Sequence, residues 1–163
     1  MSKQANPSKA ALEKLKDTDL TFVDMGLDIR GRKVVDRNGA DIGHVSALFV
    51  DDNERKIRML EIRGGGFLEV GTRHFLLPVD AITQVFKSEV HISETKDRIE
   101  HSPVYDPALV EIPTQEHWEP FYGYYGLSPY WNSGYMYPIF PLYPKKSASH
   151  NHHDHDVQEE LGS

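Results

Sequence analysis

The residues best suited to chemistry lie near the C-terminus, where imidazoles and carboxylates gather. Four histidines and two aspartates fall within seven positions: His150, His152, His153, Asp154, His155 and Asp156. Neutral imidazoles and carboxylates bind Zn²⁺, Ni²⁺ and Cu²⁺, and such a tract chelates without a prior fold. We expect weak zinc or nickel affinity that falls below about pH 6, because the imidazoles must be neutral. A physiological metal site, incidental affinity and an expression tag remain the alternatives, and the interspersed Asn and Asp disfavour the tag.

Two other polar clusters have ordinary structural explanations. Gly64-Gly65-Gly66 is followed by Phe67-Leu68, without the Lys-Ser/Thr of a phosphate loop, so we expect a bend in the backbone. The run 51–54 is rich in carboxylates but lacks the glycine and the terminal glutamate of a calcium loop, which predicts a hairpin turn.

The remaining chemistry-bearing residues form no catalytic pattern. The chain has no cysteine and no G-x-S-x-G, which excludes thiolate catalysis and argues against a hydrolase nucleophile. His44, His74, His91 and His101 are scattered, and only His74 draws attention, with an expected role in hydrogen bonding to loop carbonyls around Gly71. We therefore expect no enzyme, no catalytic residue and no organic cofactor.

An aromatic segment over residues 121–143 holds ten aromatic side chains, interleaved with Gly, Pro and Ser. Proline interrupts regular elements, so the segment predicts an irregular tail, either loosely draped or adhesive towards a partner or a second copy. The candidate partner-binding residues are Phe67, Leu68, His74, Tyr122, Tyr124, Tyr125 and Trp131.

The net charge of −7 comes mostly from residues 108–163, which carry seven acidic and two basic side chains. Nucleic-acid binding depends on Lys and Arg meeting phosphates, so we expect no direct nucleic-acid partner. The first 16 residues lack the apolar stretch of a secretory signal, and no run approaches the ~20 apolar residues of a membrane helix. We expect a cytoplasmic protein with no membrane insertion.

Residues 28–107 read as short strands separated by turn signals. Asn38-Gly39 is a strong hairpin signal, and Pro78 belongs at an edge, a bulge or a strand start. A slip in the alternation at Met59-Leu60 suits a bulge. The expected strands are 32–36, 42–51, 56–63, 74–79, 81–86 and 89–93, with helical turns at 8–16, if Leu12 and Leu15 dock, and at 94–99.

The order of these signals resembles the PRC-barrel domain family over roughly residues 15–107. The residues that carry the resemblance are Asp28–Asp36, Asn38-Gly39, Ile42-Gly43, Val45, Leu48–Asp51, Gly65–Leu68, Gly71, His74, Leu76–Ile82, Val90 and Ser102–Pro107. The resemblance implies an all-β fold, a small, strongly bent β-barrel. The residue pattern outside it adds a short N-terminal helix and a largely irregular aromatic and His-rich tail. The expected domains are a flexible or short helical 1–16, a PRC-barrel at 17–107 and a low-complexity tail at 108–163.

The family includes the cytoplasmic domain of the photosynthetic reaction centre H subunit and the C-terminal domain of the 16S rRNA-processing ribosome maturation factor. This chain shows neither the membrane helix of the first nor the additional β-domain of the second. We expect a non-catalytic protein-binding or assembly module that self-associates as a homodimer. The alternatives are an RNA-metabolism accessory that binds a ribosomal protein, a photosynthetic or membrane-complex assembly factor, and a metal-binding stress protein.

Overall fold

The computed structural model describes residues 11–22, 25–51, 53–64, 73–106, 115–138 and 144–146. Seven strands form a mixed sheet in the order β6-β5-β4-β3-β8-β7, and β1 pairs with β4. Its strands are β1 (Glu13–Lys14), β3 (Lys33–Val35), β4 (Asp41–Asp51), β5 (Lys56–Gly64), β6 (Arg73–Pro78), β7 (Ile82–Val85) and β8 (Glu89–Ile92). A separate pair joins β2 (Leu20–Phe22) to β9 (Pro144–Lys146).

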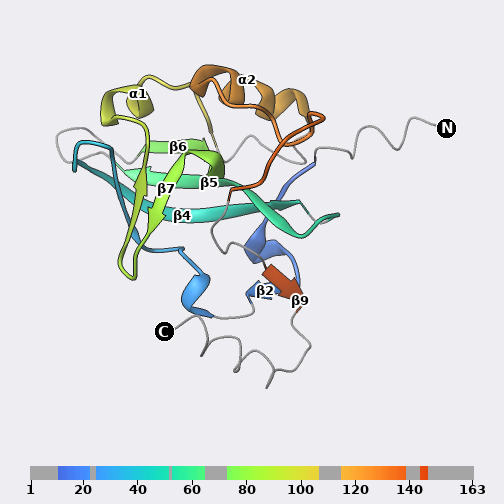
Figure 1. The fold of residues 1–163 in the computed structure, drawn as a ribbon. Coiled ribbons are helices and arrows are strands. Elements are labelled where there is room, and N and C mark those ends of the chain that lie inside the picture. The colour runs from blue at the N-terminus through green and yellow to red at the C-terminus, as the bar shows by residue number, and fades with distance from the viewer. Residues whose placement is uncertain are drawn as a thin grey trace.

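Two α-helices and three 3₁₀ turns complete the described chain. They are α1 (Lys96–Glu100), α2 (Gln115–Tyr125), η3 (Leu15–Asp17), η4 (Met25–Leu27) and η5 (Val79–Ala81). Figure 1 shows α1 and α2 beyond β6, on the side of the sheet away from the β2–β9 pair. The strands expected between residues 32 and 93 are all present to within a residue or two, and α1 supplies the helical turn expected after them.

The predicted hairpin between β3 and β4 is confirmed, and local chemistry explains it. Gly39 has φ +87°, a conformation that favours glycine. Asp36 closes the turn, because its backbone amide donates to the Ala40 carbonyl at 2.9 Å and its carboxylate accepts from the backbone amides of Asn38 and Ala40.

The sheet is not a closed barrel, which corrects the fold expected from the resemblance. The edge strands β6 and β7 are consecutive and joined by η5, yet no ladder connects them within the described residues. Pro78 ends strand β6 at the edge of the sheet, as predicted. Proline has no N–H to donate to a ladder, so an edge position suits it. The bulge predicted at Met59-Leu60 is present one residue before Met59. Met59 pairs with Phe49 and Ile57 pairs with Val50, which leaves Arg58 as the extra residue of β5.

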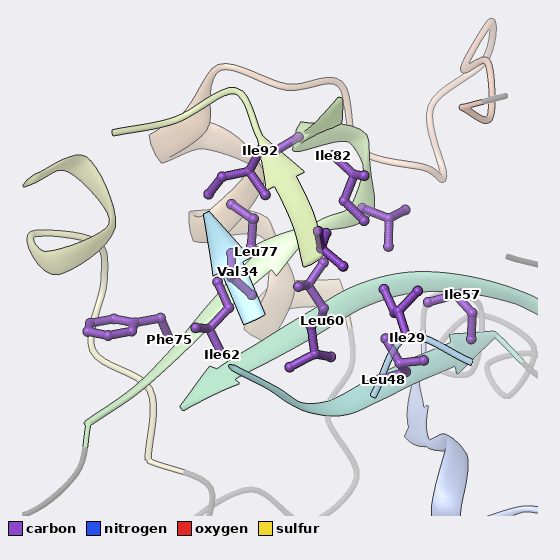
Figure 2. Close-up of a cluster of buried hydrophobic side chains, with 14 of the residues drawn as sticks. Ile29, Val34, Leu48, Ile57, Leu60, Ile62, Phe75, Leu77, Ile82 and Ile92 are labelled. Atoms are coloured by element: carbon purple, nitrogen blue, oxygen red, sulfur yellow. The ribbon is translucent and has the colours of Figure 1, made fainter. Parts of the chain in front are cut away.

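The inner face of the sheet holds the main hydrophobic core. Figure 2 shows side chains from β3 to β8 meeting there. Its members include Ile29, Val34, Leu48, Ile57, Leu60, Ile62, Phe75, Leu77, Ile82 and Ile92. Residues 11–17 form β1 and η3 in place of the expected helix. Glu13 and Lys14 pair with the C-terminal end of β4, which satisfies hydrogen-bonding groups of their backbone. Leu15 from η3 still docks on this core.

A second core lies on the outer face of β4, β5 and β6. Phe49, Met59 and Leu76 supply its sheet side. Trp118 and Phe121 of α2 pack against them and are at most 2% exposed. The prediction of an irregular aromatic tail is therefore wrong for residues 115–125, which form a helix. An apolar outer face stabilises this helix, which its own sequence does not specify.

Candidate functional site

Residues 115–138, called the aromatic cover below, fold back onto the sheet. Tyr122 and Tyr125 are buried, and Tyr124 and Trp131 are partly buried. Side chains that pack on their own sheet offer little area to a partner. Tyr122 and Tyr125 lie in the two cores, and their role in partner binding stays a prediction. Phe67, Leu68 and the six proposed metal ligands at 150–156 lie outside the described residues.

Arg58 fixes the aromatic cover to the sheet. It is 3% exposed, and its Nη2 donates to Glu54 Oε1 at 2.8 Å and lies 3.4 Å from Asp51 Oδ2. Its guanidinium carbon sits 4.2 Å from the ring centroid of Tyr130 and 5.5 Å from that of Tyr137. A buried cation needs both paired charge and close packing. Here the carboxylates of Asp51 and Glu54 supply the paired charge, and the rings of the cover supply the packing.

Two tyrosine hydroxyls add polar contacts between the cover and the sheet. Tyr135 donates to Asp80 Oδ2 at 2.7 Å, and Tyr137 donates to the Ile57 carbonyl at 3.0 Å. Burial raises the pKa of Asp80 above its ordinary value despite the Tyr135 hydrogen bond. The cover is thus held by directional contacts as well as by apolar packing.

Glu61 of β5 is a further buried charge, at 3% exposed. Its Oε2 lies 2.7 Å from His74 Nδ1, and its Oε1 lies 3.5 Å from the Tyr105 hydroxyl and 3.9 Å from Lys14 Nζ. His74 therefore bonds to a carboxylate, and the loop carbonyls around Gly71 that we expected as its partners lie outside the described residues. Burial first, and the nearby Glu61 charge second, raise the pKa of Tyr105, so its hydroxyl remains a donor at neutral pH.

Beside His74 the surface opens into a hollow of about 430 Å³. Its lining comes from the start of β6 and from the segment after α1: Arg73, His74, Phe75, Ser102, Pro103, Val104, Tyr105 and Asp106. Val104 is 93% exposed, the highest value among the large hydrophobic side chains of the described chain. Sequence reasoning identified His74 and the Pro-Val-Tyr segment separately, because nothing local shows that residues 30 positions apart meet.

The histidines and carboxylates form no group suited to holding a metal ion in the part of the chain that the structure describes. In the same residues, no helix has both the length and the apolar character to cross a membrane.

Residues 27–99 match the family model of the PRC-barrel domain. The match contains β3 to β8 and most of α1. No curated protein matches the chain. The match ends before α2, so the aromatic cover and the segment with Val104 lie outside the family domain and pack onto it.

Proposed function

We propose that the chain is a non-catalytic protein-binding module of a larger assembly, and that a segment of its partner binds in the hollow beside His74. A PRC-barrel domain supports an interaction or assembly role. The observation that carries the proposal is the near-complete exposure of Val104 in the lining of an open hollow. A branched apolar side chain left in water at a concave site gains free energy when a partner covers it.

The composition of the hollow suits a protein segment. Phe75, Pro103 and Val104 give apolar area, while Arg73 and Asp106 supply both signs of charge. Protein interfaces combine an apolar centre with polar groups around it. An extended partner segment fits this mixture, with its own charged side chains meeting those of the hollow.

The Glu61 group supports binding in preference to catalysis. Its carboxylate is buried and engaged with His74, so it holds the imidazole in place without facing a substrate. A fixed side chain loses little conformational entropy when a partner binds, which raises affinity. His74 thus serves as a preorganised polar contact in the hollow.

The test compares two equally drastic surface changes in the full chain. Val104→Asp places a charge in the hollow, and Met136→Asp places the same charge at another position, which is 82% exposed and outside the hollow. Crosslinked affinity capture from the native host, with and without RNase, is expected to recover one defined partner with the wild type and Met136→Asp, and to lose it with Val104→Asp. If Val104→Asp captures the same partner at the same yield, the hollow is not the binding site.

The identity of that partner separates the finer proposals. A ribosomal protein captured despite RNase supports an RNA-metabolism accessory, and subunits of a membrane complex support an assembly factor. Capture of a second copy, together with sedimentation that shows a concentration-dependent dimer lost in Val104→Asp, supports self-association. All three readings keep the cytoplasmic location that we propose for the chain.

A further inference from the structure

A second and larger hollow, of about 880 Å³, lies where β4 begins and β5 ends. This volume falls within the range of about 300–1,000 Å³ typical of sites for small molecules. Its walls come from four separate segments: the loop before β3, the first half of β4, the end of β5 and the first residue of α1. The two hollows share no lining residue, although Arg63 of this one is paired with His74 of the other in the β5–β6 ladder.

Two glycines on neighbouring strands bring the backbones together in this hollow. Gly43 pairs with Gly64 across β4 and β5. A Cβ on Gly43 would lie 2.3 Å from the Arg63 carbonyl oxygen, and one on Gly64 would lie 2.0 Å from the Ile42 carbonyl oxygen. Gly43 also has φ +147°, which disfavours other residues. The close approach leaves part of the lining without side chains, so larger groups at its border surround open space.

Positive charge is concentrated around that space. The lining includes Arg30, Arg63 and Lys96, together with the imidazole of His44, against a single carboxylate, Asp41. This is unusual in a chain of net charge −7. The cations belong to three different elements, so the fold brings them together although the sequence keeps them apart.

Arg63 is the cation best placed to take a ligand. It is exposed, and its guanidinium has no hydrogen bond or ion pair to any residue that the structure describes. His44 lies directly across from it in the β4–β5 register. Arg30 is different, because its Nε and Nη2 donate to the Asp28 carboxylate at 2.8 and 2.6 Å. That bond holds Arg30 in the wall of the hollow, whereas Arg63 retains its full set of donors.

We propose that this hollow binds a phosphate-bearing small molecule. The planar guanidinium of Arg63 matches two oxygens of a phosphate at once, and the other cations compensate its remaining charge. Asp41, the single carboxylate of the lining, disfavours any pose that brings the anionic group close to it. The assignment adds a ligand site to the PRC-barrel domain and does not depend on the partner proposed for the other hollow.

Pyrophosphate is the probe, titrated into the full chain at low ionic strength and followed by calorimetry and by amide chemical shifts. We expect saturable binding, with shifts at Gly43, His44 and Gly64. Arg63→Gln is expected to weaken it about tenfold or more, since a hydrogen bond to a charged group contributes about 1.5–3 kcal/mol. Lys87→Gln is the matched control, because it removes the same charge from an exposed turn residue outside the hollow and is expected to leave affinity unchanged.

Three results would overturn the proposal. Binding that does not saturate, or that weakens equally in both variants, would reduce the effect to non-specific attraction of anions. Tighter binding of succinate than of pyrophosphate would show that the hollow prefers a carboxylate to a phosphate ligand. Because Arg63 is exposed, a thermal melt of Arg63→Gln is expected to match that of the wild type, which separates lost binding from lost folding.

Discussion

At the scale of single residues, buried carboxylates connect parts of the chain that are far apart in sequence. Asp36 is 4% exposed, and its two oxygens accept hydrogen bonds from three backbone amides. The donors are Asn38 at 2.7 Å, Ala40 at 2.8 Å and Lys96 at 2.7 Å. One carboxylate therefore closes the β3–β4 turn and anchors the start of α1. Burial alone would raise the pKa of Asp36, but the three amides outweigh it and the pKa lies below its ordinary value.

The first prediction concerns the pH dependence of Asp36. A carboxyl whose pKa is lower in the folded state than in the unfolded state stabilises the fold fully above the unfolded value of 3.8, and this contribution is lost as pH falls through the folded value. Asp36→Asn should cost about 2 kcal/mol at pH 7, in the range of hydrogen bonds to a charged group. The difference in the free energy of unfolding between Asp36→Asn and the wild type should become smaller below about pH 4. Urea unfolding of both proteins at pH 7, 5 and 3 measures it, and a gap that stays constant would contradict the assignment.

At the scale of elements, the aromatic cover behaves as part of the core. The outer faces of β4, β5 and β6 are apolar where α2 lies, and Trp118 meets Phe49 edge-on at 5.2 Å between ring centroids. Pro120 is the sixth residue of α2, so it removes one intrahelical hydrogen bond and crowds the Glu116 carbonyl. Burial of Trp118 and Phe121 against the sheet offsets this cost. A truncation after residue 119 would remove Phe121 and Tyr122 and would therefore expose part of the outer core.

The second prediction tests the cover by a cavity in its centre. Trp118→Ala should lower the free energy of unfolding by about 3–5 kcal/mol, the range for removing a large buried aromatic side chain. Met136→Ala, at a cover position that is 82% exposed, should change it by less than about 0.5 kcal/mol. Urea denaturation followed by circular dichroism gives both values. If Trp118→Ala and Met136→Ala lower the free energy of unfolding by equally small amounts, the cover does not stabilise the sheet.

At the scale of the whole molecule, the two cores share the strands β4, β5 and β6. Removing the outer layer exposes side chains whose strands also form the inner core, so the layers should unfold together. Tyr125 of α2 also belongs to the inner core, which links the cover to it directly.

The third prediction follows from this sharing. The chain has two tryptophans, so Trp131→Phe leaves Trp118 as the single indole reporter of the outer core. Its fluorescence transition in urea should coincide with the loss of sheet signal in circular dichroism. A fluorescence change at clearly lower urea would show that the cover detaches first and that the PRC-barrel domain is stable without it.

The fourth prediction concerns metal binding by the whole chain through its C-terminal tract. Zinc affinity at pH 7.5 should fall sharply when His152, His153 and His155 are all changed to Ala, and in the wild type it should fall below about pH 6 as the imidazoles take up protons. Calorimetric titration of the full chain measures both. Zinc affinity that is the same in wild type and variant would remove the metal-binding hypothesis.

The sequence by itself determined the strands of the PRC-barrel domain, the hairpin at Asn38-Gly39 and the bulge near Met59. These features depend on neighbours within a few residues, through period-two alternation, turn chemistry and glycine or proline geometry. One local signal went unused: the continuous apolar run Leu48–Val50 predicts a strand buried on both faces, and hence a layer on the outer side of the sheet.

Only the tertiary structure decided that the aromatic segment forms that layer, that Glu61 meets His74 and Tyr105, and that Arg63 shares a hollow with Lys96. Each of these arrangements brings together residues more than ten positions apart, which meet only once the sheet has formed. Burial and hydrogen bonding then stabilise the outer layer and the Glu61 group. The open sheet was decided in the same way, because closure depends on a ladder between β6 and β7, and their separate patterns do not encode it.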